Sequence, residues 1–338
     1  MRKPLAVNSR DVARLAGVAQ STVSKVANNS ANLSDETRRR VIQAARELGY
    51  SLNQHKKNYC IAVIVPESRY IGYIAAMLWS LSQELINKGM RMEILQENNL
   101  ELLNDRCIDG AISINWKKEL TSQWGEMSSL PLVRINAPSN HQNNCYSVCP
   151  NGIGSLQKTI DLLWKMGHRK IGFFFFNSLH HEHNNYARRL DGFIQAMEKH
   201  GVNAPERYCL FDCLRKESCE LISQLQHWYQ EGVSAIIFSN ALGTGKMMQA
   251  IQLAGLRIPE DISVIGWEQP LFSDFTIPPL STLSPDYENL SKSAVDLLLK
   301  LISKRSDVQD ILMPYCWIKR ESIAPNHNFA GENLQNTN

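Results

Sequence analysis

The chain has 338 residues, of which 43% are hydrophobic, and its formal net charge at pH 7 is +3. This length exceeds what one hydrophobic core usually supports, so we expect two or three packed domains. No apolar stretch approaches the roughly 20 residues that span a bilayer, and the N-terminus lacks the apolar segment of a signal peptide. The sequence therefore predicts a cytoplasmic protein with no membrane partner.

Basic residues are concentrated near the N-terminus. Residues 1–57 contain eleven Lys and Arg but four Asp and Glu, which gives this segment +7 and leaves −4 for the remainder. A basic head on a slightly acidic body is typical of a nucleic-acid-binding domain joined to a separate effector domain.

Two short helices joined by a tight turn are predicted between residues 8 and 29. Asn8 can cap the first helix, and Gly17 suits the turn because glycine tolerates positive φ. Apolar residues recur at helical spacing on the inner face of both helices: Val12, Ala13, Ala16, Val23 and Val26. The pattern predicts a helix-turn-helix whose second helix, from about Gln20 to Asn28, enters the DNA major groove.

The outer face of this second helix carries polar groups that can bond to base edges or phosphates: Gln20, Ser21, Ser24 and Lys25. A hairpin that only packs would more often carry a mixture of Glu and Lys there. A third helix is expected from Ser34 to Leu48, with Ser34 as its cap and Gly49 as its end. Three such helices form a minimal DNA-binding domain.

From Ile61 onward, apolar strands alternate with amphipathic helices, which predicts an α/β fold with parallel sheets. The first unit has predicted strands at 61–66, 90–95, 110–114 and 132–135, and a helix with Met77, Leu78 and Leu81 on its apolar face. The second unit has predicted helices at 153–166, 188–200, 218–230 and 245–254, and strands at 170–176, 235–239 and 263–266. The final stretch has a strand at 281–283, a helix at 286–303 and a strand pair near 311–320. Two such units predict two lobes with a ligand site between them, at the carboxyl ends of the strands.

No nucleophile, acid–base pair or phosphate-binding loop has the spacing that catalysis requires, so the sequence predicts a protein that is not an enzyme. The eight cysteines are expected to stay reduced, and none has the spacing of a zinc site. His180, His181 and His183 could bind a metal, but a polar loop is favoured because no Cys or carboxylate pair completes a ligand set. We expect no metal and no cofactor.

Two N-terminal blocks, DVARLAGVAQSTVSKVANN and LSDETRRRVIQAARELGY, are similar to the DNA-binding segment of the lactose-repressor (LacI/GalR) family of transcription regulators. Later blocks, among them WKMGHRKIGFF, YARRLDGF and GLRIPEDISVIGWEQP, resemble the effector domain of the same family, to about Pro325. The resemblance implies a helix-turn-helix domain followed by a two-lobed domain with the fold of periplasmic sugar-binding proteins. In that fold the chain crosses between the lobes three times.

The resemblance also implies which residues meet DNA. Gln20, Ser21 and Lys25 occupy the positions that contact bases in the family, and Lys25 replaces the Arg of many members. The remaining candidates on the DNA-binding surface are Ser24, Asn28, Arg38, Lys56 and Lys57.

The linker departs from the family pattern. Leu52-Asn53 replaces Pro-Asn, and seven residues separate Asn53 from Ile61. A two-turn helix alone needs about seven residues. We therefore expect an irregular hinge and little bending of the DNA, in place of the helix that family members insert into the minor groove.

The effector-binding candidates follow from the resemblance as well. Arg189 stands three residues before Gly192, where the family has an Arg that binds ligand hydroxyls, and Asn240 matches an Asn that follows a strand. Glu268 replaces the family's Asp and either contacts the ligand or has a structural role, in loop capping and a salt bridge between the lobes. Tyr70 and Tyr73 either stack on a sugar ring or belong to the lobe core.

We thus predict a homodimeric regulator, with repression favoured over activation, that binds a pseudo-palindromic operator and responds to a sugar or sugar derivative. The alternatives are a nucleoside or phosphorylated metabolite as effector, or weak or absent effector control because the hinge is short. The expected domains are a DNA-binding domain at 1–50, a hinge at 51–60, an effector and dimerisation domain at 61–325 and a disordered tail at 326–338. Lobe 1 is expected at about 61–150 plus 282–310 and lobe 2 at about 151–281 plus 311–325.

Overall fold

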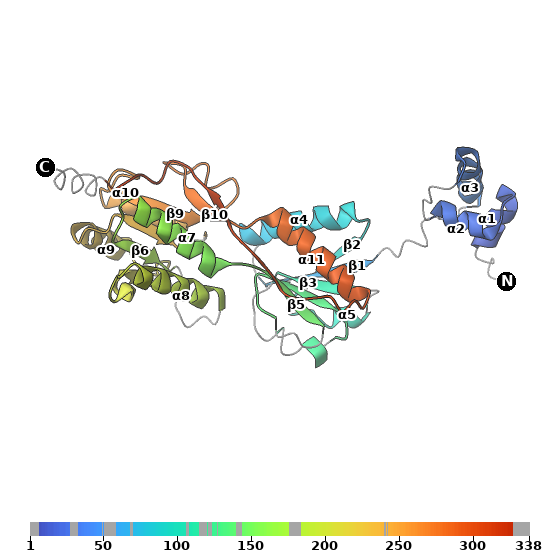
Figure 1. Ribbon diagram of the computed structural model, residues 1–338, viewed down its shortest axis with the longest axis horizontal. Coiled ribbons are helices and arrows are strands. Elements are labelled where there is room, and N and C mark those ends of the chain that lie inside the picture. The colour runs from blue at the N-terminus through green and yellow to red at the C-terminus, as the bar shows by residue number, and fades with distance from the viewer. Residues whose placement is uncertain are drawn as a thin grey trace. The chain divides into compact units, whose positions relative to one another are not determined.

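The chain forms a small N-terminal unit and a larger unit that begins at Cys60 (Figure 1). The computed structural model describes residues 7–27, 33–48, 50, 59–67, 70–105, 108–114, 120, 124–126, 128–139, 144–175, 184–239, 241 and 243–326. Residues 51–58 of the predicted hinge at 51–60, residues 327–338 of the predicted tail at 326–338, and His180, His181 and His183 lie outside these residues. Among the helices so described, none is long and apolar enough to span a bilayer.

The N-terminal unit consists of the three predicted helices: α1 (Ser9–Ala16), α2 (Gln20–Ala27) and α3 (Asp35–Glu47). Their inner faces form one small core: Val12, Ala13, Ala16, Val23, Val26, Val41, Ala44 and Ala45. Gly17 has φ +63° at the end of α1, and the Ser34 hydroxyl caps α3 by accepting from the Thr37 N–H at 3.3 Å. The sequence pattern is confirmed in this unit.

Asn8 fixes the start of α1 through a reciprocal cap. Its side-chain oxygen accepts from the backbone N–H of Arg10 at 2.9 Å, while its own N–H donates to the Asp11 carboxylate at 3.1 Å. Because the amide of Asn8 satisfies the free N–H groups of the first turn, the Ser9 hydroxyl is not needed for capping.

The larger unit contains two six-stranded sheets. The first has the order β11-β5-β4-β3-β1-β2 and is parallel at every pairing whose register is resolved. Its strands are β1 (Cys60–Val65), β2 (Arg91–Gln96), β3 (Gly110–Ser113), β4 (Leu132–Ile135), β5 (Cys145–Pro150) and β11 (Ile311–Met313). Helices α4 (Tyr73–Asn87) and α11 (Tyr287–Ile302) contact each other and lie side by side in Figure 1, and the short helix α5 (Leu102–Asp105) contributes to a second apolar cluster.

The second sheet has the order β12-β10-β9-β8-β6-β7. Within it β12 runs antiparallel to β10, and the other pairings between its described strands are parallel. Its strands are β6 (Ile171–Phe174), β7 (Cys209–Leu210), β8 (Ala235–Phe238), β9 (Ser263–Trp267), β10 (Ser281–Ser284) and β12 (Cys316–Ile318). Helices α7 (Gly152–Lys165) and α8 (Asn184–Lys199) pack with one apolar cluster, and α9 (Ser218–Gln230) and α10 (Thr244–Leu253) pack with another. A 3-10 helix, Pro205–Tyr208, precedes β7.

The chain crosses between the two sheets three times, as the resemblance implies. The crossings lie at Asn151, at residues 285–286 and at residues 314–315. Two expectations are wrong here. Residues 311–320 do not form a strand pair, because β11 joins the first sheet and β12 joins the second.

The lobe boundaries shift for the same reason. Residues 282–284 belong to β10 in the second sheet, and residues 311–313 belong to β11 in the first, so each was assigned to the opposite lobe. Apolar spacing marks strands but does not say which sheet a short strand joins. The pairing of β11 with β5 decides it.

Strand β5 has no clear sequence signal, because its residues CYSVCP include a serine at a buried position. The backbone N–H of Ser147 donates to the Asp310 carboxylate at 2.7 Å, which links β5 to the segment before β11. The two-residue strand β7 is too short for any periodicity to appear.

His168 ties the last described segment to the second lobe. Its Nε2 donates to the Ala324 carbonyl at 3.0 Å, since a carbonyl can only accept, and its Nδ1 lies 2.9 Å from the Ser234 hydroxyl. Burial lowers the pKa of His168 below its ordinary value of 6.5. The folded protein therefore favours the neutral form of the imidazole ring.

We expect stability to fall as the pH is lowered through about 6.5. The unfolded chain then binds a proton at this residue that the folded chain resists, and the loss continues until the lower folded-state pKa is passed. Measuring the free energy of unfolding between pH 8 and 5 for the native chain and for His168→Gln tests this. The variant should lose part of the slope; an unchanged slope would contradict the assignment.

Candidate functional site

The predicted base-contacting residues lie together on α2. Gln20, Ser21 and Lys25 are exposed, Ser24 is half-buried, and Val23 fixes the opposite face in the core. A shallow hollow of about 270 Å³ runs along this surface, lined by Ser9, Gln20, Ser21, Val23, Ser24, Ala27 and Tyr50. The surface offers neutral donors and acceptors beside one cation, which is the chemistry that base edges and phosphates require.

Two residues from outside α2 line the hollow and were not predicted as part of the DNA-binding surface. Ser9, at the start of α1, accepts a hydrogen bond from the Gln20 side-chain amide at 2.9 Å. Tyr50 follows α3, where its backbone N–H donates to the Ala45 carbonyl at 2.8 Å, and it lines the hollow together with residues of α2. No spacing rule indicates either residue, because both reach α2 from other helices.

Of the four remaining DNA-binding candidates, the structure describes one, Arg38. Arg38 is half-buried in the first turn of α3. Asn28, Lys56 and Lys57 lie outside the described residues, so their roles remain predictions.

In the larger unit, the two lobes bring one cation and four aromatic side chains together, here called the aromatic cluster: Tyr73, Arg189, Trp267, Tyr287 and Tyr315. The Arg189 guanidinium lies 3.7 Å from the centre of the Trp267 ring, and Tyr315 meets that ring edge-on at 4.6 Å. Tyr73 and Tyr287 pack at 5.8 Å between ring centres. Tyr73 starts α4 and Tyr287 starts α11. Trp267 ends β9, Tyr315 lies in the last crossing, and Arg189 lies on α8.

Several polar atoms at the cluster are buried without a hydrogen-bond partner among the described residues: the hydroxyls of Tyr73 and Tyr287, the indole N–H of Trp267 and the nearby Ser239 hydroxyl. Burial raises the pKa of Tyr73 and Tyr315 above 10, so their hydroxyls stay protonated near neutral pH. Unsatisfied buried polar groups are costly, and native structures usually supply a partner for them. A bound polar molecule would do so.

Arg189 is positioned by close helix packing. A Cβ on Gly192 would lie 3.0 Å from the Ile153 Cα, so glycine allows α8 to approach α7 closely. Arg189 donates to the Ser239 carbonyl oxygen, and its second nitrogen lies 3.4 Å from the Tyr315 hydroxyl. Of the five predicted effector residues, the structure brings Arg189 and Tyr73 together.

The remaining effector candidates are placed differently. Tyr70 is 38% exposed, and its hydroxyl lies 3.5 Å from the Gln96 amide on β2, apart from the aromatic cluster. Asn240 lies outside the described residues.

The Glu268 carboxylate is held by an ion pair within the second lobe. Arg320 donates to it at 3.0 and 3.4 Å, and the Thr282 hydroxyl donates to it as well. Both side chains are almost fully covered, at 13% exposure for Arg320 and 6% for Glu268. Glu268 therefore does form a salt bridge, but within the second lobe and not between the two lobes, where the sequence interpretation placed it.

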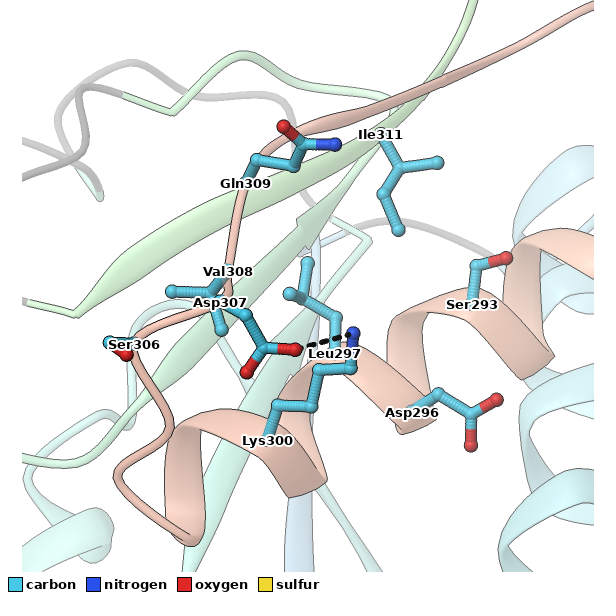
Figure 2. Close-up of a pocket in the computed structure, with 9 residues that line it drawn as sticks. All are labelled: Ser293, Asp296, Leu297, Lys300, Ser306, Asp307, Val308, Gln309 and Ile311. Carbon is cyan, nitrogen blue, oxygen red and sulfur yellow. Dashed lines mark ion pairs between the residues drawn. The ribbon is translucent and has the colours of Figure 1, made fainter.

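A hollow of about 530 Å³ lies elsewhere, between the second half of α11 and the segment that leads into β11 (Figure 2). Its charged groups are paired: Lys300 lies 3.8 Å from Asp307, and Asp296 accepts from Lys88 at 2.9 Å. None of the predicted effector residues lines it. Across the described residues, no group of three or more His, Cys, Asp or Glu side chains is arranged to hold a metal ion.

Removing Arg320 should destabilise the second lobe strongly. Arg320→Met leaves the Glu268 carboxylate buried without its cation, which typically costs about 3–5 kcal/mol of the free energy of unfolding. The matched control is Arg305→Met, because Arg305 pairs with Asp307 at the surface, where an exposed pair contributes about 1 kcal/mol or less. Denaturant unfolding measures both; equal losses would show that the Glu268 pair is not energetically buried.

The comparisons with known proteins agree with this architecture. Residues 10–53 match the family described as "Bacterial regulatory proteins, lacI family", and residues 160–323 match the "Periplasmic binding protein-like domain". A curated relative, the HTH-type transcriptional repressor PurR of Salmonella newport (strain SL254), is 26% identical over 332 residues, 93% of this chain and 96% of the relative.

Two solved structures share the fold. The Lac repressor dimer bound to operator and the anti-inducer ONPF has a TM-score of 0.68 at 21% identity, over 94% of this chain and 99% of that one. The complex of the transcriptional regulator CelR with cellobiose has a TM-score of 0.65 at 20% identity, with the same coverage. The three-helix head, the two sheets joined by three crossings and these matches together show a helix-turn-helix domain of the lacI family of bacterial regulatory proteins, followed by a periplasmic-binding-protein-like domain.

Proposed function

We propose that this protein is a sequence-specific repressor of transcription that binds a pseudo-palindromic operator as a homodimer and responds to a small molecule held between its lobes. The observation that carries the proposal is the outer face of α2. Gln20, Ser21 and Lys25 project from a helix whose inner face is locked in the head core, so their positions are set before DNA arrives.

The aromatic cluster supports control by a small molecule. Its ring faces can stack on a planar or sugar-like molecule. The Tyr73 and Tyr287 hydroxyls and the Trp267 indole N–H are buried and lack hydrogen-bond partners within the part of the chain that the structure describes. The CelR structure contains cellobiose, which favours a sugar or sugar derivative as effector. A nucleoside or phosphorylated metabolite is the second candidate, because stacked aromatic side chains suit a planar base equally well.

Exposed apolar side chains support the homodimer. On α4, Trp79 is 68% exposed and Ile86 is 64% exposed, and the seven-residue spacing places them on one face. Met77, Leu78 and Leu81, which form the apolar face predicted for this helix, are buried in the first lobe and are not available to a second copy. The second lobe adds exposed apolar residues after β9: Leu271, Phe275 and Ile277. Apolar surfaces of this kind usually mark protein–protein contacts.

Gln20→Ala should change which bases are preferred, by about 1–3 kcal/mol at the position that Gln20 faces, because a base contact is lost. Arg38→Ala should weaken binding to all sequences alike if Arg38 meets a phosphate. Binding of the full chain to single-substitution variants of a selected operator measures both. Gln43→Ala is the matched control, since Gln43 is exposed on α3 and does not line the hollow. Unchanged preference in Gln20→Ala would contradict the assignment.

Arg189→Ala should abolish the response to effector while leaving operator affinity intact. The effector is first identified by thermal-shift screening of sugars and nucleosides, and operator binding is then repeated with the hit. Arg169→Ala is the matched control, because Arg169 also stacks on a tryptophan, Trp164 at 4.6 Å, but outside the aromatic cluster. A normal response in Arg189→Ala would show that Arg189 does not contact the ligand. A hit that stabilises the protein without changing operator affinity would favour the alternative of weak coupling through the short hinge.

A further inference from the structure

The first turn of α1 and the first turn of α2 are joined by one side-chain hydrogen bond. The Gln20 Nε2 donates to the Ser9 hydroxyl at 2.9 Å, and both residues line the hollow along α2. Asn8 caps α1, so the Ser9 hydroxyl has no capping duty. Small side chains at the contact of the helices, among them Ala13 and Ala16, hold the two first turns within reach of each other.

This bond restricts what the Gln20 amide can offer to a base. A free amide has two N–H donors and one acceptor oxygen. With one N–H engaged by Ser9, a single N–H and the oxygen remain, in one plane. That donor–acceptor pair matches the N7 and N6 groups of adenine, whereas guanine presents two acceptors in the major groove and needs two donors.

The geometry points to Ser9 as a positioning residue that makes Gln20 select adenine over guanine at the base pair it faces. The inference rests on the proposed function, because it assumes that α2 enters the major groove. Ser9 acts through Gln20 and needs no base contact of its own. In the free protein the bond is exposed and competes with water, but water is excluded when the helix docks, so the constraint acts in the complex.

The test is selection by the full chain from a library of palindromic duplexes with randomised half-sites, followed by affinity measurements on adenine and guanine variants of the selected sequence. The native chain should prefer adenine at one position in each half-site, and Gln20→Ala should abolish that preference. Ser9→Ala should reduce it about fivefold to tenfold, the worth of one hydrogen bond. Ser9→Thr, which keeps the hydroxyl, should retain it. In the Gln20→Ala background, Ser9→Ala should have no further effect on preference.

The possible failures are distinguishable. If the native chain enriches no sequence, the proposed function fails and this inference with it. If Gln20→Ala changes the preference but Ser9→Ala does not, the function stands and the inference is wrong. A loss of affinity in Ser9→Ala that is equal for all sequences overturns it as well, because that result assigns Ser9 to a phosphate contact. Selection of guanine at the Gln20-dependent position also overturns it.

Discussion

The DNA-binding surface depends on how closely α1 and α2 can pack. Their contact is built from small side chains, with Ala13 and Ala16 on α1 facing Val23 and Val26 on α2. Larger residues would separate the helices, since a packed core tolerates added volume poorly. Because the helices are this close, the outer face of α2 is held at a fixed orientation, and Ser9 reaches Gln20. A rigid contact surface is what discrimination between bases requires.

The larger unit is built from two lobes that pack separately. Each lobe has its own sheet and core, and the chain passes between the sheets at three points. Two residues of the aromatic cluster lie at these crossings: Tyr287 directly follows one, and Tyr315 lies in another. A molecule bound there would touch both lobes and so could favour one arrangement of them over another, which is the differential contact that any ligand-driven switch needs.

Much of this could be predicted from the sequence, for a physical reason. The head has strict helical periodicity, a capping residue and a turn glycine, so its helices, core and α2 surface follow from local rules. The parallel sheets follow from buried apolar runs such as that of β1. Strand β5 escapes prediction because Tyr146 and Ser147 interrupt its apolar run, while its position depends on sheet pairing and on the bond from the Ser147 N–H to Asp310, a residue distant in sequence. The sheet joined by β11 likewise depends on pairing, which periodicity does not encode.

The residues of the aromatic cluster could be predicted only in part. Arg189 was singled out because it matches a family position, and Tyr73 was left between two interpretations, a ligand contact or a core residue. Trp267, Tyr287 and Tyr315 were missed, because each is a single aromatic residue in an ordinary apolar stretch and only the fold brings them together. Glu268 illustrates the opposite case: its sequence position suggests a ligand contact, while Arg320, more than fifty residues away, holds its carboxylate.

Recognition of two related half-sites by two copies of this head is tested most directly by the stoichiometry and symmetry of the native complex. Sedimentation of the full chain with a duplex selected from random sequence measures the stoichiometry. We expect two chains per duplex and a selected sequence with two-fold symmetry. One chain on an asymmetric site, or binding with no sequence preference, would contradict it.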